Sequence, residues 1–439
     1  MAVSMDEHFT YRKILRYSLP NIGTMIAITS FQTADGYFAS NWLGVVPFAA
    51  VNFVYPIVML FSAPGFMIGS GGSAIISATK GEGSPGKARE YFTMVVIALL
   101  LTGVLTGGIV YFLLPGILRV AGASDELMPY CLEFGHILLL FLPCMLISTA
   151  FQSLWVAAEK GTTGFLLSLL QGLVNVFFDW LLIVQLGWGV IGAALGTALG
   201  ITVFTLITLA YFMRPNDSGI YFVRYHFEPK TFFGICYNGS SEMVDAVSAN
   251  IVELVFNLRL IQLIGEIAVA AYGVYAYVNE FFLSVFFALG TTTVTLVGYN
   301  YGRKNYGEIR SLRNKNTVLT LSIGVIMTLA AWLFSEGIAG VFLGYDQEVH
   351  VLTTQVLRIC SLRFLIYGFN IFVSSYFTGL QKGTISAILA FLESLIMPVL
   401  SILILPEIFG IKAIWFTLPA ASLVTMVVSA LLLVKKSQP

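Results

Sequence analysis

Acidic residues stand inside long apolar stretches of this 439-residue chain, where an ionised carboxylate is costly. The clearest are Asp35 and Asp179, which follow the basic residues Arg16 and Lys160 by nineteen positions each. At the helical rise both acids lie roughly 28 Å from those basic residues, in one layer. Two carboxylates with neutral oxygens beside them hold a proton or a small hard cation. The alternative is a hydrogen-bonded pair that only fixes helix packing.

Helical spacing aligns further polar side chains with each of these acids. Steps of three and four residues connect Asn21, Thr24, Ile28, Gln32 and Asp35. These positions share one helix face, so the face needs water or protein beside it, and Gln32 is a candidate contact for a bound molecule. Asn175 precedes Asp179 by four residues, which aims an amide and a carboxylate in the same direction.

The second half of the chain carries its own acidic stripe. Steps of three and four residues connect Glu242, Asp245, Ala249, Glu253 and Asn257. Glu242 and Asp245 follow the helix-start signal Asn238–Ser241, so they either stabilise the positive end of the helix dipole or belong to a site. Glu253 lies about three turns deeper, beyond the reach of a cap, which favours a binding role.

Three more ionisable residues fall within predicted spans, namely Glu280, Arg363 and Glu393. Arg363 can neutralise Glu280 or Glu393, and such an ion pair serves structure as readily as it contacts a bound molecule. Both acids are therefore further candidates for a site in the second half. The sequence leaves the partner of Arg363 open.

The composition of the chain indicates which kind of structural element holds these side chains. Hydrophobic residues make up 57% of the chain and charged residues 10%, whereas about a quarter of a soluble domain is charged. A membrane-spanning helix needs about 20 apolar residues. Twelve stretches meet that length, near residues 15–40, 45–78, 91–114, 132–157, 164–186, 190–213, 238–263, 267–298, 317–343, 350–380, 384–405 and 411–434. We predict an all-α polytopic membrane protein with twelve transmembrane helices.

The two halves of the chain resemble each other. Gly44, Phe61, Gly69, Gly81 and Arg89 recur 221 residues later as Gly265, Phe282, Gly290, Gly302 and Arg310, and Lys160–Thr162 returns as Lys382–Thr384. Six spans return the chain to the side it left, so the repeats are parallel, about an axis along the membrane normal. The predicted organisation is an N-terminal six-helix lobe (1–213), a cytoplasmic linker (214–235) and a C-terminal six-helix lobe (236–439), with a cavity between the lobes.

The distribution of charge predicts the orientation. With both termini cytoplasmic, most of the 23 Lys and Arg residues fall in cytoplasmic segments, and Arg119 and Lys412 lie outside. We therefore expect a multi-pass protein of the cell membrane. A net charge of zero indicates no nucleic-acid partner.

Other function classes lack their motifs. The four histidines are dispersed, with no spacing typical of a catalytic metal, so an enzyme is not predicted. No Gly-rich loop followed by Lys and Ser or Thr is present, which argues against ATP-driven pumping by this chain. No cofactor is expected, and the protein is expected to be a monomer.

The residues described above resemble those of multidrug and toxic compound extrusion (MATE) transporters, in the branch with DinF-like and MepA-like proteins. The resemblance covers nearly the whole chain. It rests on Asp35–Phe38 with Leu43–Gly44, on Asn175 to Asp179, on Asn238–Glu242 and on Gly298–Gly302.

The resemblance implies a V-shaped pair of six-helix lobes that exports amphipathic, often cationic compounds in exchange for protons or sodium by alternating access. It also implies that Asp35, Asn175 and Asp179 form a cation site in the N-terminal lobe, with Thr197 supplying a hydroxyl. Glu393 stands where many relatives are basic, and the second-half acids match no ion site of the family. Their roles, and the choice between proton and sodium, stay open.

Two other transporter functions compete with this interpretation. A lipid-linked oligosaccharide flippase of the wider superfamily typically has two more spans and a strongly cationic cavity, and the sequence has neither feature. An exporter of one specific metabolite would share the architecture. A channel or scaffold fits less well, because duplicated halves with buried acids suit an exchange between two states.

Overall fold

The computed structural model describes residues 8–43, 45–343 and 347–436, and its regular secondary structure in these ranges is helical. Gly44 and the side chain of Gln32 lie outside the described part of the chain. The first half comprises α1 (Tyr11–Trp42), α2 (Val45–Gly81), α3 (Pro85–Val120), α4 (Met128–Leu140), α5 (Leu142–Ala157), α6 (Gly161–Asp179), the π-helical turn η1 (Trp180–Gln185) and α7 (Gly189–Phe212).

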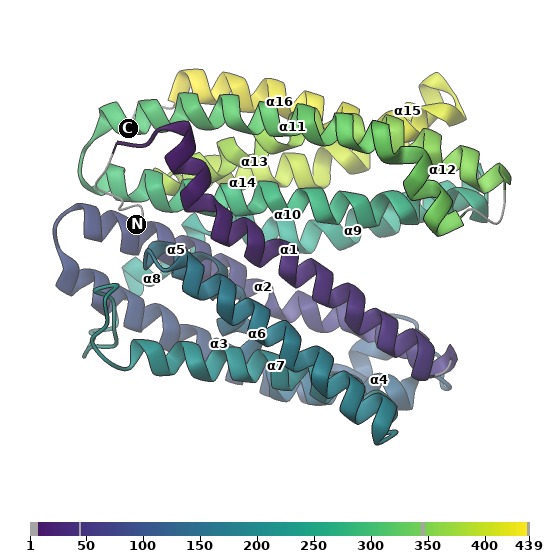
Figure 1. Cartoon of the computed structure of the whole chain (residues 1–439), viewed down its shortest axis with the longest axis horizontal. Helices are drawn as coiled ribbons and strands as arrows, with labels where there is room; N and C mark the ends of the chain where they lie inside the picture. Colours follow the sequence, from purple (N-terminus) through teal and green to yellow (C-terminus); the bar gives the residue numbers. More distant parts are fainter. Residues whose placement is uncertain (1–7, 44, 344–346, 437–439) are drawn as a thin grey trace.

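The second half begins with the short α8 (Pro229–Asn238). It continues through α9 (Ser240–Leu263), α10 (Glu266–Gly302), α11 (Tyr306–Leu343), α12 (Gln347–Cys360), η2 (Ser361–Arg363), α13 (Phe364–Gly379), α14 (Gly383–Phe391), the π-helical turn η3 (Leu392–Ile396), α15 (Met397–Phe409), η4 (Ile411–Phe416) and α16 (Thr417–Lys436). The start of α1 and the end of α16 lie at the same end of the molecule, which we call the termini end (Figure 1).

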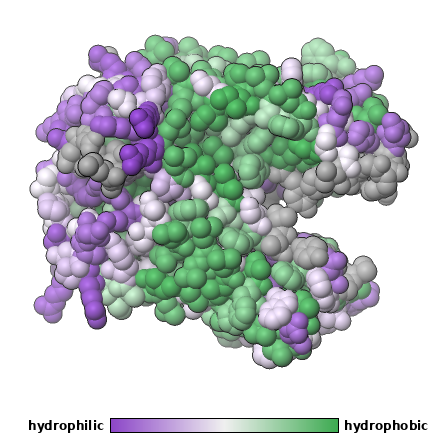
Figure 2. Space-filling view, in the orientation of Figure 1, coloured by the Kyte–Doolittle hydropathy of each residue, from purple (hydrophilic) through white to green (hydrophobic). Residues whose placement is uncertain are grey.

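Nine helices in the described ranges are long and apolar enough to cross a membrane. The pair α4 and α5 adds a tenth span with a bend of 63°, where Pro143 lies in the first turn of α5 and cannot donate a backbone hydrogen bond. The remaining predicted spans are α1 and α9, with 32 and 24 residues. Figure 2 shows an apolar belt between polar ends. The predicted all-α architecture of twelve transmembrane helices is confirmed.

The duplication is visible in the turns. Glu159 and Gln381 both adopt a positive φ, of 59° and 58°, immediately before the repeated Lys-Gly-Thr segment. The backbone N–H of Glu159 donates to the carbonyl of Val156, and that of Gln381 donates to the carbonyl of Thr378. The residues of the second turn lie 222 positions after those of the first, so the repeat extends to backbone geometry.

The two halves meet along α2 and α10. A side-chain carbon at Gly81 would overlap the carbonyl of Tyr299, and one at Gly302 would overlap the carbonyl of Ala78. Each contact is the image of the other at a shift of 221 residues, so the seam is pseudo-symmetric. Chain direction places this seam at the termini end, where both helices finish. Glycine is required there because the backbones touch.

Helix α1 crosses from one lobe to the other (Figure 1). Before α1 begins, residues 8–10 form a short N-terminal strap on α11. The backbone N–H of Phe9 donates to Oε1 of Glu308 at 2.9 Å, and Nδ1 of His8 lies 2.6 Å from Oε2 of the same carboxylate. The Phe9 ring is 0% exposed in a core that includes Leu312. The start of α1 therefore packs in the C-terminal lobe, although sequence order assigns it to the N-terminal lobe.

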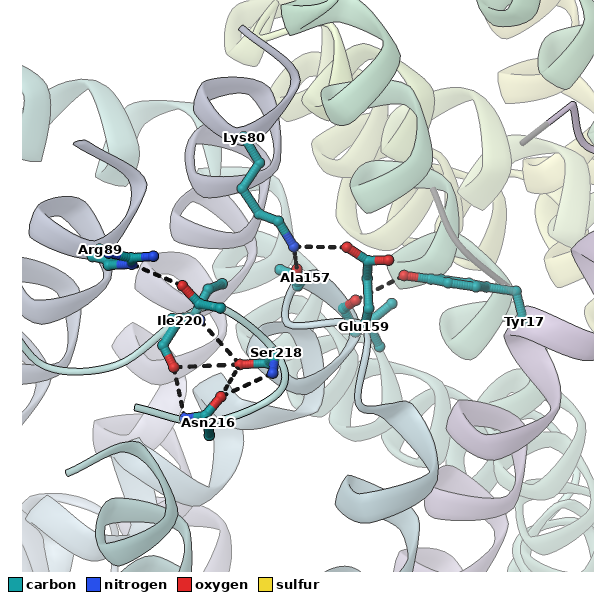
Figure 3. Close-up of polar contacts among 10 residues, drawn as sticks. Tyr17, Lys80, Arg89, Ala157, Glu159, Asn216, Ser218 and Ile220 are labelled. Carbon is teal, nitrogen blue, oxygen red and sulfur yellow. Dashed lines mark hydrogen bonds and ion pairs between the residues drawn. The ribbon is translucent and has the colours of Figure 1, made fainter. Parts of the chain in front are cut away.

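The predicted linker is partly helical, since α8 begins at Pro229 and passes the predicted boundary at residue 235. The loop before α8 is ordered by side chains (Figure 3). Nδ2 of Asn216 donates to the carbonyl of Ile220 at 2.8 Å, and Nε of Arg89 donates to that of Gly219 at 2.8 Å. Figure 3 also shows Lys80 of α2 paired with Glu159 at 2.7 Å, which ties α2 to the turn between α5 and α6.

Candidate functional site

Close helix packing brings together the acids of the first half. α6 packs against both α1 and α7. A side-chain carbon at Gly172 would overlap the ring of Phe31 from α1, and one at Gly196 would overlap Oδ1 of Asp179 from α6. Asp179 is the last residue of α6 before the π-helical turn η1, a distortion that often occurs at functional positions.

The resulting cluster contains four polar side chains from three helices. Oγ1 of Thr197 donates to Oδ2 of Asp35 at 3.2 Å, and Nδ2 of Asn175 donates to Oδ2 of Asp179 at 3.1 Å. The carboxyl groups of Asp35 and Asp179 lie within hydrogen-bonding contact of each other. The structure therefore assembles all four residues that the sequence suggested, although 162 residues separate Thr197 from Asp35.

The cluster has the chemistry of a proton or cation site. Asp179 is 0% exposed, and its Oδ1 accepts no hydrogen bond from any described residue. Two carboxylates in contact repel each other unless a proton or a cation lies between them. The neutral oxygen of Thr197 and the amide of Asn175 add the kind of donor that a small hard ion prefers. The residues present thus fit either a proton or a small cation.

A separate cavity of about 730 Å³ lies between the lobes. The surface is hollowed at the end opposite the termini, which we call the open end (Figure 2). Residues of α1, α2 and α5 line one wall, including Met25, Phe66 and Gln152. The predicted acids of the second half line the other wall, namely Glu242, Asp245, Glu253 and Glu280. Neither Asp35 nor Asp179 is among the described residues that line this cavity.

The geometry settles the partner of Arg363. Its Nη2 lies 3.6 Å from Oε1 of Glu393, and its guanidinium stacks over the ring of Tyr367 at 4.2 Å. Glu393 is 2% exposed and lies in η3 behind the cavity wall. Ser422 and Asn370 donate to its two oxygens at 2.5 and 2.8 Å. Glu393 is thus a fully satisfied buried carboxylate that holds Arg363 in place.

Sequence reasoning missed the partners Asn370 and Ser422, because a single amide or hydroxyl in a span carries no burial penalty comparable to that of an acid. The repeat could have identified one of them. Asn370 and Glu393 lie 222 residues after Ser148 and Gln171, and Ser148 donates to Oε1 of Gln171 at 3.1 Å. The same pair of positions is hydrogen-bonded in both lobes.

The other second-half acids differ in their surroundings. Asp245 is 9% exposed and accepts a hydrogen bond from Ser394. Glu242 is hydrogen-bonded to Ser70 of α2, so it reaches the opposite lobe. Glu253 and Glu280 are exposed to the cavity. Glu242 and Asp245 therefore do more than cap the start of α9.

Comparison with known proteins agrees with this architecture. The profile of the family described as MatE matches residues 20–181 and 243–403, one copy in each half. The multidrug export protein MepA of Staphylococcus haemolyticus (strain JCSC1435) is 23% identical over 426 residues, which cover 95% of this chain and 92% of that protein. MepA of Staphylococcus aureus (strain MSSA476) is 22% identical, over 94% of this chain and 91% of that protein.

Solved structures share the fold. An outward-facing conformation of a multidrug resistance MATE family transporter of the MOP superfamily superposes with a TM-score of 0.89 at 22% identity, over 97% of this chain and 95% of that one. A MOP superfamily transporter from Pyrococcus furiosus Vc1 (DSM3638) gives the same TM-score, identity and coverage. With both halves matched by the family profile, the chain belongs to the multidrug and toxic compound extrusion family of membrane transporters.

Proposed function

We propose that this protein is a secondary active antiporter that exports amphipathic or cationic organic compounds in exchange for protons or sodium by alternating access. The observation that carries the proposal is the carboxyl pair of Asp35 and Asp179, which lies in one lobe, outside the cavity between the lobes. Two separate sites suit exchange, because the ion and the exported compound each favour a different state.

The exported compound binds in the cavity between the lobes. Four carboxyl groups line one wall, while Arg363, the cation among the described residues of that wall, is paired with Glu393. Apolar residues of the opposite wall, such as Met25 and Phe66, contact the hydrocarbon part of the compound. An acidic and partly apolar cavity suits an amphipathic cation and disfavours the anionic headgroup of a lipid-linked oligosaccharide.

Helix α1 couples the two sites. It carries Asp35 near one end, contributes Met25, Ile28 and Thr29 to the cavity wall, and begins at the strap on α11. Pro20 lies inside α1 and frees a backbone carbonyl, which permits bending. A proton or a cation bound between the two acids removes their repulsion, so α1 repacks against α6, the cavity shrinks and the compound leaves.

In the cell, both termini face the cytoplasm and the monomer spans the cell membrane, so the cavity opens to the outside. The charge distribution along the sequence supports this orientation, because the loops and helix ends at the termini end together hold most of the basic residues.

The test is efflux of ethidium, an aromatic monocation, from proteoliposomes under an imposed pH gradient and, separately, an imposed sodium gradient. We expect one gradient to drive efflux and Asp35→Asn to abolish it, because the amide keeps the shape but cannot exchange a proton or neutralise an ion. Asp179→Asn has the same effect, and Asn175→Ala a smaller one, because it removes a neutral ligand. Efflux by Asp35→Asn at the wild-type rate would contradict the proposal.

Asp217→Asn provides a matched control outside the membrane. A hydrogen bond from Lys160, with a second from Tyr211, holds the pKa of Asp217 below its ordinary value. The contribution of Asp217 to stability is therefore present above its ordinary pKa and is lost only as the pH falls through the lowered value. Asp217 stays ionised near neutral pH, so this variant is expected to keep the wild-type pH dependence of efflux.

A further inference from the structure

The acids of the cavity fall into two groups along α9. Glu242 and Asp245 lie at its first turns, and Glu253 lies eight residues beyond Asp245. At the helical rise these groups are separated by roughly 12 to 17 Å. Between the two groups, α9 presents apolar and mostly small side chains to the cavity, namely Ala246, Ala249 and Val252.

Glu242 and Asp245, which we call the inner group, form no ion pair with Arg363, the basic residue among the described residues that line the cavity. Nη2 of Arg363 lies 3.6 Å from Oε1 of Glu393, and its guanidinium covers the ring of Tyr367. Glu242 and Asp245 instead engage the neutral hydroxyls of Ser70 and Ser394. Two carboxyl groups without a basic ion-pair partner among the described residues therefore lie at the inner end of the cavity.

The second group, which we call the outer group, is also acidic. Glu253 of α9 and Glu280 of α10 both line the cavity and are exposed to it. No basic residue forms an ion pair with either of them in the described part of the chain. Tyr272 also lines the cavity, with its ring packed against that of Phe256 at 4.3 Å.

We infer that the cavity preferentially takes elongated dications, compounds with two cationic heads joined by an apolar chain. One head binds at Glu242 and Asp245, the other at Glu253 and Glu280, and the chain lies on the alanine face of α9. Two heads on one chain gain affinity because the second binding event is intramolecular, and the gain depends on the length of the chain. This inference rests on the proposed function, since it specifies the compound that the export cavity prefers.

The experiment compares three probes on the purified full-length protein in nanodiscs by isothermal titration calorimetry. Decamethonium carries two quaternary ammonium heads on a long chain, hexamethonium carries them on a short chain, and decyltrimethylammonium carries one head on the long chain. We expect decamethonium to bind roughly tenfold more tightly than either of the others. Equal affinity for decamethonium and decyltrimethylammonium overturns the preference for dications and leaves the proposed export of cations intact.

Variants locate the two heads. Glu253→Gln and Glu280→Gln are each expected to lower the affinity for decamethonium toward that for decyltrimethylammonium, while the affinity for the monocation changes less than twofold. Glu126→Gln, the same substitution on an exposed acid of the loop after α3, is the control and keeps the tenfold preference. A preference that survives both cavity variants overturns the assignment of the outer group. Absence of binding by all three probes, with no ethidium efflux under either gradient, would contradict the proposed function as well.

Discussion

At the scale of single residues, the cluster of Asp35, Asn175, Asp179 and Thr197 depends on a glycine. Gly196 of α7 packs against Oδ1 of Asp179, so any side chain there displaces the carboxylate from Asp35. We expect Gly196→Ala to reduce ion-driven efflux at least tenfold, because a small misplacement of a coupling group has a large effect on rate. Efflux from proteoliposomes under the driving gradient measures this.

A matched glycine provides the control at the same scale. Gly108 lies within α3, and a side-chain carbon there would meet nothing within 4 Å. Gly108→Ala is expected to preserve efflux and to stabilise the protein by about 0.5 kcal/mol or more, since alanine loses less conformational entropy in a helix. Equal loss of efflux in both variants would mean that Gly196 has no special relation to Asp179.

At the scale of elements, the strap of residues 8–10 fixes the start of α1 to α11. Phe9 is fully buried, whereas Tyr11, two residues along, is 45% exposed. Phe9→Ala is expected to destabilise the docked strap by about 3 kcal/mol, the usual cost of removing a buried aromatic ring. Limited proteolysis measures this, and the N-terminal segment of Phe9→Ala should be cleaved faster than that of the wild type. Tyr11→Ala is the control for loss of an aromatic ring.

The strap also joins the element that carries Asp35 to the C-terminal lobe. The carboxylate of Glu308 accepts from Phe9 and lies beside His8, while Nζ of Lys315 donates to the carbonyl of Phe9 at 2.5 Å. If α1 transmits ion binding, Phe9→Ala should slow efflux as well as expose the segment. Unchanged efflux with a cleavable strap would confine the role of the strap to stability.

At the scale of the whole molecule, the proposed alternating access requires the seam between α2 and α10 to open so that the cavity faces the termini end. Ser73 and Thr295 lie in this seam with their hydroxyl oxygens 3.1 Å apart. The double variant Ser73→Cys and Thr295→Cys is expected to cross-link on oxidation and to lose efflux at least tenfold, with recovery on reduction. The distance suits a disulfide, which would hold the two lobes together.

The single variants Ser73→Cys and Thr295→Cys control for this experiment, because the chain already contains four free cysteines. Each single variant should be insensitive to oxidation. Full efflux by the cross-linked double variant would show that transport proceeds without opening of the α2–α10 seam.

The sequence alone determined the number of membrane spans, the duplication and the identity of the acids that lie within spans. These features are local, because the apolar length of a span, the spacing of a helical face and the cost of an acid in hydrocarbon can be read within a few turns. Asp35, Asp179 and Glu253 could therefore be predicted as candidates.

Only the tertiary structure decided which candidates belong together. Arg363 could pair with Glu280 or Glu393 by sequence, and the choice of Glu393 follows from Ser422 and Asn370, which lie 29 and 23 residues away from it in the chain. The separation of the Asp35–Asp179 cluster from the cavity likewise depends on how closely the helices approach. Close backbone contact at glycines sets these distances. Glycine has no side chain whose spacing or charge would reveal such a contact in the sequence.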